Sequence, residues 1–333
     1  MSWWQVTADT LAASRFVTSP LAETVAALKT LHDGAAAHPG ERRWLDAHQP
    51  DYRARLAADP VTAALVPAAL GPRWNATFLT PTPMGEEAGF DEELARIRRT
   101  PSAAARADLA ESSNGSLPAP LLDREDLARR AADLLEWVWR ETVRPTWPRR
   151  RRIVEADVVA RTARLAAGGW VAALDDMRPG MRWLGGNRLQ VTAYESPPLE
   201  LTDVRLLFVP VTFARSWVCW DLPPEGDAAH TTRRFAVVYP CAGVLAAEAD
   251  GKRAPQALSA LLGSARAELL ALLESPKSTT QLVALTGLPL GSVGRHLRIL
   301  REARLAERRR AGRSVLYYRT SAGQALVDAQ LAP

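Results

Sequence analysis

Arginines crowd one stretch near the end of the chain, where they alternate with apolar residues. Between Leu288 and Arg313 there are eight arginines and only two acidic residues. A guanidinium group offers a planar fork of N–H donors that matches phosphate oxygens and the major-groove edge of guanine. Apolar residues recur at regular intervals through the same stretch. It is therefore expected to meet a polyanion on one side and a packed core on the other.

Helical spacing separates these two kinds of residue in the segment LPLGSVGRHLRILREARL. Val293, Leu297 and Leu300 are predicted to form its buried face, and Pro289 suits the first turn. The opposite face then holds the polar groups that could reach DNA, namely Ser292, Arg295, His296 and Arg298. Arg295 is our first candidate for reading a base, because arginine can donate two hydrogen bonds to guanine.

A shorter helix is expected just before it, in STTQLVALTG. Ser278 or Thr279 can cap this helix, Leu282 faces inward and Gly287 makes the turn. Two short helices joined by a glycine turn, the second one basic on its outer side, describe a helix-turn-helix. We expect the first turn of the shorter helix to contact phosphates through Thr279, Thr280 and Gln281.

A β-hairpin is expected after the two helices. LAERRR and SVLYYR flank AGR, and alternation around a glycine-containing turn is typical of a hairpin. This hairpin would be a wing whose arginines lie near phosphates or a minor groove: Arg308, Arg309, Arg310 and Arg313. Upstream, LSALLGSARAELLALLES predicts one amphipathic helix from Leu258. A solvated helical hairpin is the alternative, but the order of helix, turn, helix and wing argues against it.

Charge and composition divide the chain of 333 residues. From Leu258 to Pro333 there are eleven basic and five acidic residues, so this end has a net charge of +6, whereas the rest of the chain sums to −1 and the whole chain to +5. The segment AEADGKRAPQALS combines glycine, proline and charges, which indicates a boundary. We therefore expect a domain over residues 1–250 and a DNA-binding domain over residues 256–333.

The larger domain is expected to be α+β, with helices followed by a small, mostly antiparallel sheet. Helices are predicted on both sides of Ser19–Pro20, over DREDLARRAADLLEWVWRETV up to Pro145, and over VEADVVARTARLAAGG. Thr100–Pro120 is predicted to be a loop. After Gly185 the period changes, and the runs NRLQVTAYE, VRLLFVPVTF, SWVCW and RRFAVVYPCAG predict three to five strands.

Several functional classes are disfavoured by the sequence. No apolar run is long enough to span a bilayer and no signal peptide is recognisable, so we expect a cytoplasmic protein. The five histidines lack metal-ligand spacing, and nucleotide-binding or nucleophile motifs are absent, so neither an enzyme nor a cofactor is expected. Cys219 and Cys241 could form a redox pair, although free buried cysteines are the commoner outcome.

The segment TTQLVALTGLPLGSVGRHLRILREARLAERRRAGRSVLYYRT resembles the winged helix-turn-helix of the ArsR family of bacterial transcription regulators. The resemblance covers about Leu258–Leu326 and implies a homodimer, most simply a repressor, that binds two half-sites of an operator. The chain departs from the family pattern at Pro289 and Gly294, where serine is frequent. Ser278 and Thr280 occupy the positions of the Cys-x-Cys of metal-sensing members, so metal sensing through that site is not expected.

The N-terminal segments ASRFVTSPLAETVAALKTLHD, RRWLDA and AGGW resemble the large domain found in a group of long actinobacterial regulators of this kind. We hypothesise that this domain binds a small, partly aromatic ligand through tryptophans, with Trp137, Trp183, Trp217 and Trp220 as candidates. Tryptophans that only fill the core are the simpler explanation. Two other hypotheses stay open, namely a protein-interaction platform without a small ligand and an enzyme tethered to DNA.

Overall fold

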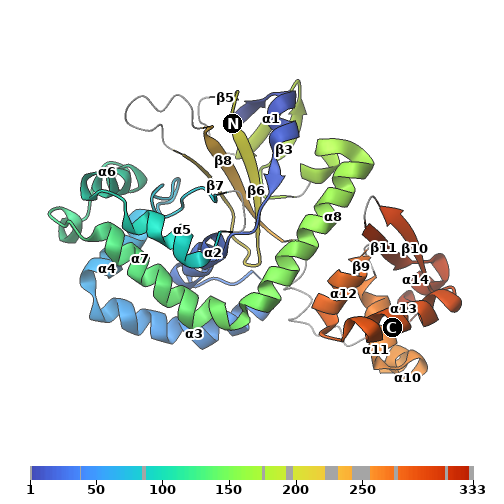
Figure 1. Cartoon of the computed structure of the whole chain (residues 1–333). Helices are drawn as coiled ribbons and strands as arrows, with labels where there is room; N and C mark the ends of the chain where they lie inside the picture. The colour runs from blue at the N-terminus through green and yellow to red at the C-terminus, as the bar shows by residue number, and fades with distance from the viewer. Residues whose placement is uncertain are drawn as a thin grey trace. The chain divides into compact units, whose positions relative to one another are not determined.

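The computed structural model describes residues 2–37, 39–84, 88–174, 177–192, 198–221, 232–241, 256–273, 277–311 and 314–329. These residues form two compact units, both drawn in Figure 1. The first is built from Met1–Ala37, Glu41–Pro148 and Asp175–Cys241, and the second from His38–Gly40, Arg149–Leu174 and Ala242–Pro333. Within the described ranges, no helix has the length and apolar character needed to cross a membrane.

The helices of the first unit begin and end where capping residues stand. Helix α2 (Pro20–Asp33) starts after Ser19, whose hydroxyl accepts a hydrogen bond from the Ala22 amide, and ends at Gly34 in the left-handed conformation. The short α1 (Ala8–Ala13) is capped by Thr7, so the predicted break between two helices is confirmed. The further helices are α3 (Pro39–Ala58), α4 (Pro60–Ala69), α5 (Phe90–Arg98), α6 (Ser102–Ser112), the 3-10 turn η1 (Ala119–Leu121) and α7 (Leu127–Val138).

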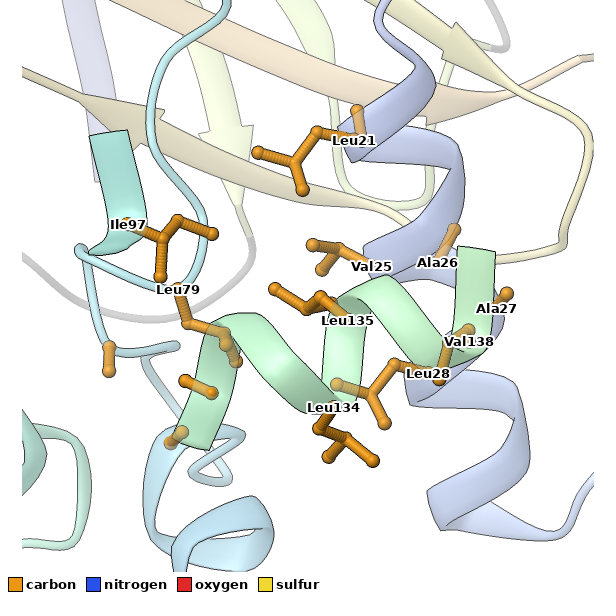
Figure 2. Close-up of a cluster of buried hydrophobic side chains, with 14 of the residues drawn as sticks. Leu21, Val25, Ala26, Ala27, Leu28, Leu79, Ile97, Leu134, Leu135 and Val138 are labelled. Atoms are coloured by element: carbon orange, nitrogen blue, oxygen red, sulfur yellow. The ribbon is translucent and has the colours of Figure 1, made fainter. Parts of the chain in front are cut away.

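Helices α2 and α7 pack against each other in the centre of this unit. In Figure 2, Val25 and Leu28 of α2 lie beside Leu134, Leu135 and Val138 of α7. All five side chains are buried, and so are Leu127 and the three alanines of α7. These residues form the apolar, core-facing side of the helix.

Two sequence-based expectations about helices are wrong. Helix α6 occupies part of Thr100–Pro120, because Ala105 and Leu109 supply a buried face and the run of Ser, Asn, Gly and Pro residues that suggested a loop begins only near its end. Pro145 does not stop the chain from coiling: a π turn (η2, Trp139–Val143) and a 3-10 turn (η3, Arg144–Thr146) lead into α8 (Trp147–Leu174). Proline is tolerated there because it stands in the first turn of a new helical segment.

The strands of the first unit form two sheets. One has the order β3-β4-β1-β5 and the other β2-β6-β8-β7. Their bounds are β1 (Ser2–Val6), β2 (Arg15–Phe16), β3 (Arg182–Gly185), β4 (Arg188–Thr192), β5 (Leu199–Leu201), β6 (Arg205–Val211), β7 (Trp217–Trp220) and β8 (Arg234–Pro240).

Both sheets are mixed, so the expectation of one mostly antiparallel sheet is wrong. Strand β1 pairs in parallel with β5 but antiparallel with β4, and β6 pairs in parallel with both β2 and β8. The parallel pairs join segments that are far apart in sequence or linked by crossovers, which hairpin patterns do not reveal. One face of the β6–β8 pair packs on the helices through Leu207, Val209 and Val238.

The second unit contains the C-terminal elements. They are α10 (Gln256–Leu262), α11 (Ser264–Leu272), β9 (Lys277–Ser278), α12 (Thr279–Thr286), α13 (Leu290–Glu302), β10 (Ala306–Ala311), β11 (Ser314–Arg319) and α14 (Ser321–Asp328). The single long helix expected from Leu258 is divided into α10 and α11, because Gly263 has a φ of 84°, which a helix cannot contain. Leu270, Leu282 and Leu297 belong to the core of this unit.

Candidate nucleic-acid interface

The turn between α12 and α13 has the geometry of a helix-turn-helix. Gly287 ends α12 in the left-handed conformation, with a φ of 68°, and its amide donates to the Val283 carbonyl at 3.0 Å. Pro289 then precedes α13, and no side chain caps this helix. Glycine is favoured at such a position because it has no side chain to clash. Only three residues, Gly287–Pro289, separate the end of α12 from the start of α13.

Helix α13 has one buried and one exposed face. Val293, Leu297 and Leu300 are buried, as their spacing predicts. Arg295 and Arg298 are exposed on the opposite side. Arg298 lies 3.9 Å from Glu302, and both side chains are about two-thirds exposed, so this weak pair leaves the guanidinium accessible.

Ser292 and His296 are half-buried and flank the exposed face of α13. Burial, followed by the charges of Arg266 and Arg295, lowers the pKa of His296 below its ordinary value. Its Nδ1 is buried and finds no hydrogen-bond partner in the described part of the chain. Burial and the two neighbouring arginines therefore favour the neutral imidazole. The positive charge of these arginines also favours an anion bound nearby.

The first turn of α12 is held by a capping box. The Gln281 amide donates to Oγ of Ser278 at 3.1 Å, and the Ser278 amide donates to Oε1 of Gln281 at 2.6 Å. Nε2 of Gln281 also donates to the carbonyl oxygen of Ala156 in α8. Gln281 is 5% exposed and its amide is engaged on both sides, so it is not accessible for the phosphate contact expected from the sequence. Thr279 is half-buried, and the side chain of Thr280 lies outside the described residues.

The wing is an antiparallel hairpin of β10 and β11, with β9 as a third strand. Arg308 pairs with Tyr317 and Arg309 pairs with Leu316, so the two exposed arginines point to opposite faces of the hairpin. The Arg309 guanidinium lies 5.2 Å from the centre of the Tyr318 ring. The side chain of Arg310 and all of Arg313 lie outside the described residues.

The four tryptophans proposed for ligand binding lie in different places. Trp137 of α7 is half-buried beneath Arg55, and Trp183 is half-buried in β3. Trp217 is buried in the core on one face of β7, whereas Trp220 lies on the other face and lines a cavity of about 400 Å³. The lining of this cavity does not include the other three.

That cavity also contains residues that sequence reasoning missed. Arg96, Arg233 and Arg234 reach it from α5 and from the start of β8, and Asp221 lies between them. Only the adjacent pair Arg233–Arg234 could have been noticed in the sequence.

Cysteine and metal chemistry find little support among the described residues. Neither Cys219 nor Cys241 forms a disulfide within the described ranges, and burial raises the pKa of the Cys219 thiol to about 12. Asp175, Asp176 and His230 lie outside the described residues. Within the described part, no three side chains of His, Cys, Asp or Glu gather where they could hold a metal ion.

Comparison with known proteins bears on the C-terminal elements. Residues 265–308 match the family model described as bacterial regulatory protein, arsR family. The matched range extends from α11 to the first residues of β10 and includes the whole helix-turn-helix. No curated protein and no solved structure gives a match to the chain. The chain thus carries an ArsR-type helix-turn-helix, which indicates DNA-binding transcriptional regulation, while its N-terminal region has no family assignment and no enzyme family is identified.

Proposed function

We propose that the protein binds an operator in double-stranded DNA as a homodimer and acts, most simply, as a repressor. One observation carries this proposal: the matched helix α13 buries Val293, Leu297 and Leu300 while it exposes Arg295 and Arg298. A rigid helix that presents arginines from an anchored face is the arrangement that reads bases in the major groove.

We assign a role to each side chain of the proposed interface from its position on α12, α13 or the wing. Arg295 reads a base, with Arg298 beside it, and Ser292 and His296 contact the backbone at the flanks of α13. Thr279 and the wing residues Arg308 and Arg309 bind phosphates, which fixes the register of the protein on the duplex. From the sequence alone, we extend the phosphate-binding group to Thr280, Arg310 and Arg313.

Dimerisation is assigned to the outer helices α10 and α14. Leu261 of α10 is 67% exposed, which is unusual for a leucine beside an otherwise well-packed core. A second copy of the chain that covered this residue would remove an exposed apolar side chain from water. Helix-turn-helix dimers of this kind read half-sites about 34–36 Å apart, which is one turn of DNA.

The N-terminal unit is proposed to sense a small molecule. The support for this is the cavity of about 400 Å³ beside Trp220, a volume within the range of ligand sites. The alternative is that this unit serves as a protein-interaction platform without a small ligand.

Selection from random duplexes tests the proposal. The full chain, immobilised at a fixed salt concentration, is expected to enrich a sequence with two related half-sites. Fluorescence anisotropy should then show that the enriched duplex binds about 10³-fold or more tightly than a shuffled one. The absence of any enriched sequence, with the chain folded by circular dichroism, would contradict the assignment.

A further inference from the structure

A cavity of about 400 Å³ opens in the first unit beside the edge strand β7. Its apolar wall includes Phe78, Pro81 and the indole of Trp220. Trp74 packs edge-on against this indole, with 5.4 Å between the ring centres. Cavities of such a volume enclose small organic ligands, and aromatic walls favour a flat or bulky apolar body.

The other side of the cavity is charged. Three guanidinium groups line it (Arg96, Arg233 and Arg234), against two carboxylates (Asp108 and Asp221), so one positive charge is in surplus. Nε and Nη2 of Arg234 donate to Asp221 at 2.7 and 3.2 Å, and Asp108 accepts a bond from the Phe78 amide at 2.7 Å. Both carboxylates are thus occupied, and the unbalanced charge falls on the other two arginines.

Arg233 has the most unused hydrogen-bonding capacity. Its Nη2 donates to the Asp221 carbonyl at 3.4 Å, but its Nε is buried and has no partner among the described residues. Its guanidinium carbon lies 5.3 Å from the centre of the Phe235 ring, which holds it beside the cavity. A buried donor without a partner destabilises the fold, and a ligand oxygen that accepted its hydrogen bond would remove this cost.

Arg96 is the second available group. One of its nitrogens donates to the Thr82 carbonyl, and another lies 3.6 Å from Asp221, beyond a hydrogen bond. Burial, and then the charge of Arg234, lowers the pKa of Arg96. An anion bound here would stabilise this partly desolvated charge.

We propose that the cavity binds a carboxylate with an aromatic or apolar body, the carboxylate on Arg233 and Arg96 and the body against Trp220 and Phe78. The surplus of one positive charge matches a single carboxylate better than a phosphate monoester, which carries about −1.5 to −2. This inference deepens the effector-sensing part of the proposed function, and it rests on that part only for its regulatory meaning.

Calorimetric titration of the full chain tests the proposal that the cavity binds a carboxylate. Three acids are titrated, namely 2-naphthoate, 3-phenylpropionate and indole-3-acetate, and each is compared with its own carboxamide. At least one acid is expected to bind about tenfold or more tightly than its amide, because only the ionised acid forms charge-assisted hydrogen bonds with the two arginines. Arg233→Gln should abolish this preference, whereas Arg129→Gln, a control at an exposed arginine of α7, should keep it.

A second cavity variant keeps the proposal testable if Arg233→Gln does not fold. Ala104 lines the cavity from an exposed position on α6, so Ala104→Trp should fill the cavity and weaken acid and amide alike. Equal affinity for every acid and its amide, or unchanged binding in both cavity variants, would overturn the proposal. Binding of the selected duplex by the same samples is read separately. If specific DNA binding fails while acid binding persists, the regulator assignment falls and the cavity assignment stands.

Discussion

The side-chain amide of Gln281 donates a hydrogen bond to the main-chain carbonyl of Ala156, 125 residues earlier in the sequence. Its oxygen accepts from the amide of Ser278, the residue that caps α12. One buried side chain therefore completes the first turn of the helix-turn-helix and joins it to α8. This explains why a polar residue stands at a buried position.

Gln281→Ala is expected to lower the free energy of unfolding of the chain by about 2 kcal/mol, because two hydrogen bonds are lost and the Ser278 amide stays buried. Urea unfolding followed by circular dichroism measures the change. Gln324→Ala is the matched control, because Gln324 makes one exposed bond to Asp328 and its loss should cost less than about 0.5 kcal/mol. Equal effects of the two variants would contradict the structural role of Gln281.

Arg295→Ala and Arg309→Ala are expected to affect DNA binding differently. Loss of Arg295 should relax the preference at one base position by about 1–3 kcal/mol, because a base-reading contact is removed. Loss of Arg309 should weaken selected and shuffled duplexes equally and lower the salt slope by about 1. Anisotropy titrations at several salt concentrations measure both, with Arg129→Ala as an unaffected control. If both variants lose affinity for the two duplexes to the same extent, the division of roles is wrong.

If the proposed dimer forms through α10, Leu261→Glu is expected to convert it to a monomer and to weaken binding to a two-half-site duplex. The folded monomer should keep its stability, because the side chain is exposed in the single chain. Sedimentation velocity measures the oligomeric state. Val171→Glu is the control, since Val171 is also an exposed apolar residue but lies on α8. A wild-type monomer, or a dimer that survives the Leu261 change, would refute the assignment of α10.

Because of Glu93, the free energy of unfolding of the chain should fall as the pH rises. Glu93 is buried in α5, where it accepts bonds from the Ser19 hydroxyl and the Leu21 amide. Burial raises its pKa from 4.5 to about 7, so the folded chain holds a proton that the unfolded chain has lost. The free energy of unfolding should therefore decrease between about pH 4.5 and 7 and level off above this range.

Glu93→Gln removes this titration. The stability difference between variant and wild type should shift in favour of the variant by about 3 kcal/mol between pH 4.5 and 8, as the raised pKa implies. Glu125→Gln, at an exposed position that is not among the groups that shift the pKa of Glu93, should leave the pH dependence unchanged. An identical pH profile for all three proteins would show that Glu93 is ionised in the fold.

Local signals in the sequence were sufficient for the helix-turn-helix and for the two-stranded hairpin of the wing. The spacing of Val293, Leu297 and Leu300 predicts both faces of α13, and Gly287 predicts its turn, because these signals lie within one or two helical turns. Gly263 is a local signal of the same kind and could have indicated the break between α10 and α11. The apolar residues that continue at helical spacing on both sides of Gly263 obscured this break.

Contacts between distant segments could not be predicted. The short strands β1 and β2 carry too few residues for a period, and β1 pairs with β4 about 180 residues later. Gln281 looked like a phosphate contact because nothing in the sequence indicates that Ala156 lies beside it. The cavity unites Arg96 with Arg233, and only the fold brings these two residues together.

Ser278 belongs to two elements at once: it pairs with Leu316 in the sheet of the wing, and its hydroxyl caps α12. The wing cannot be replaced by that of another regulator without affecting α12, because the new hairpin would have to reproduce the strand register that holds this serine in place. Exchange of recognition specificity between such proteins should therefore tolerate new side chains on α13 far better than a transplanted hairpin.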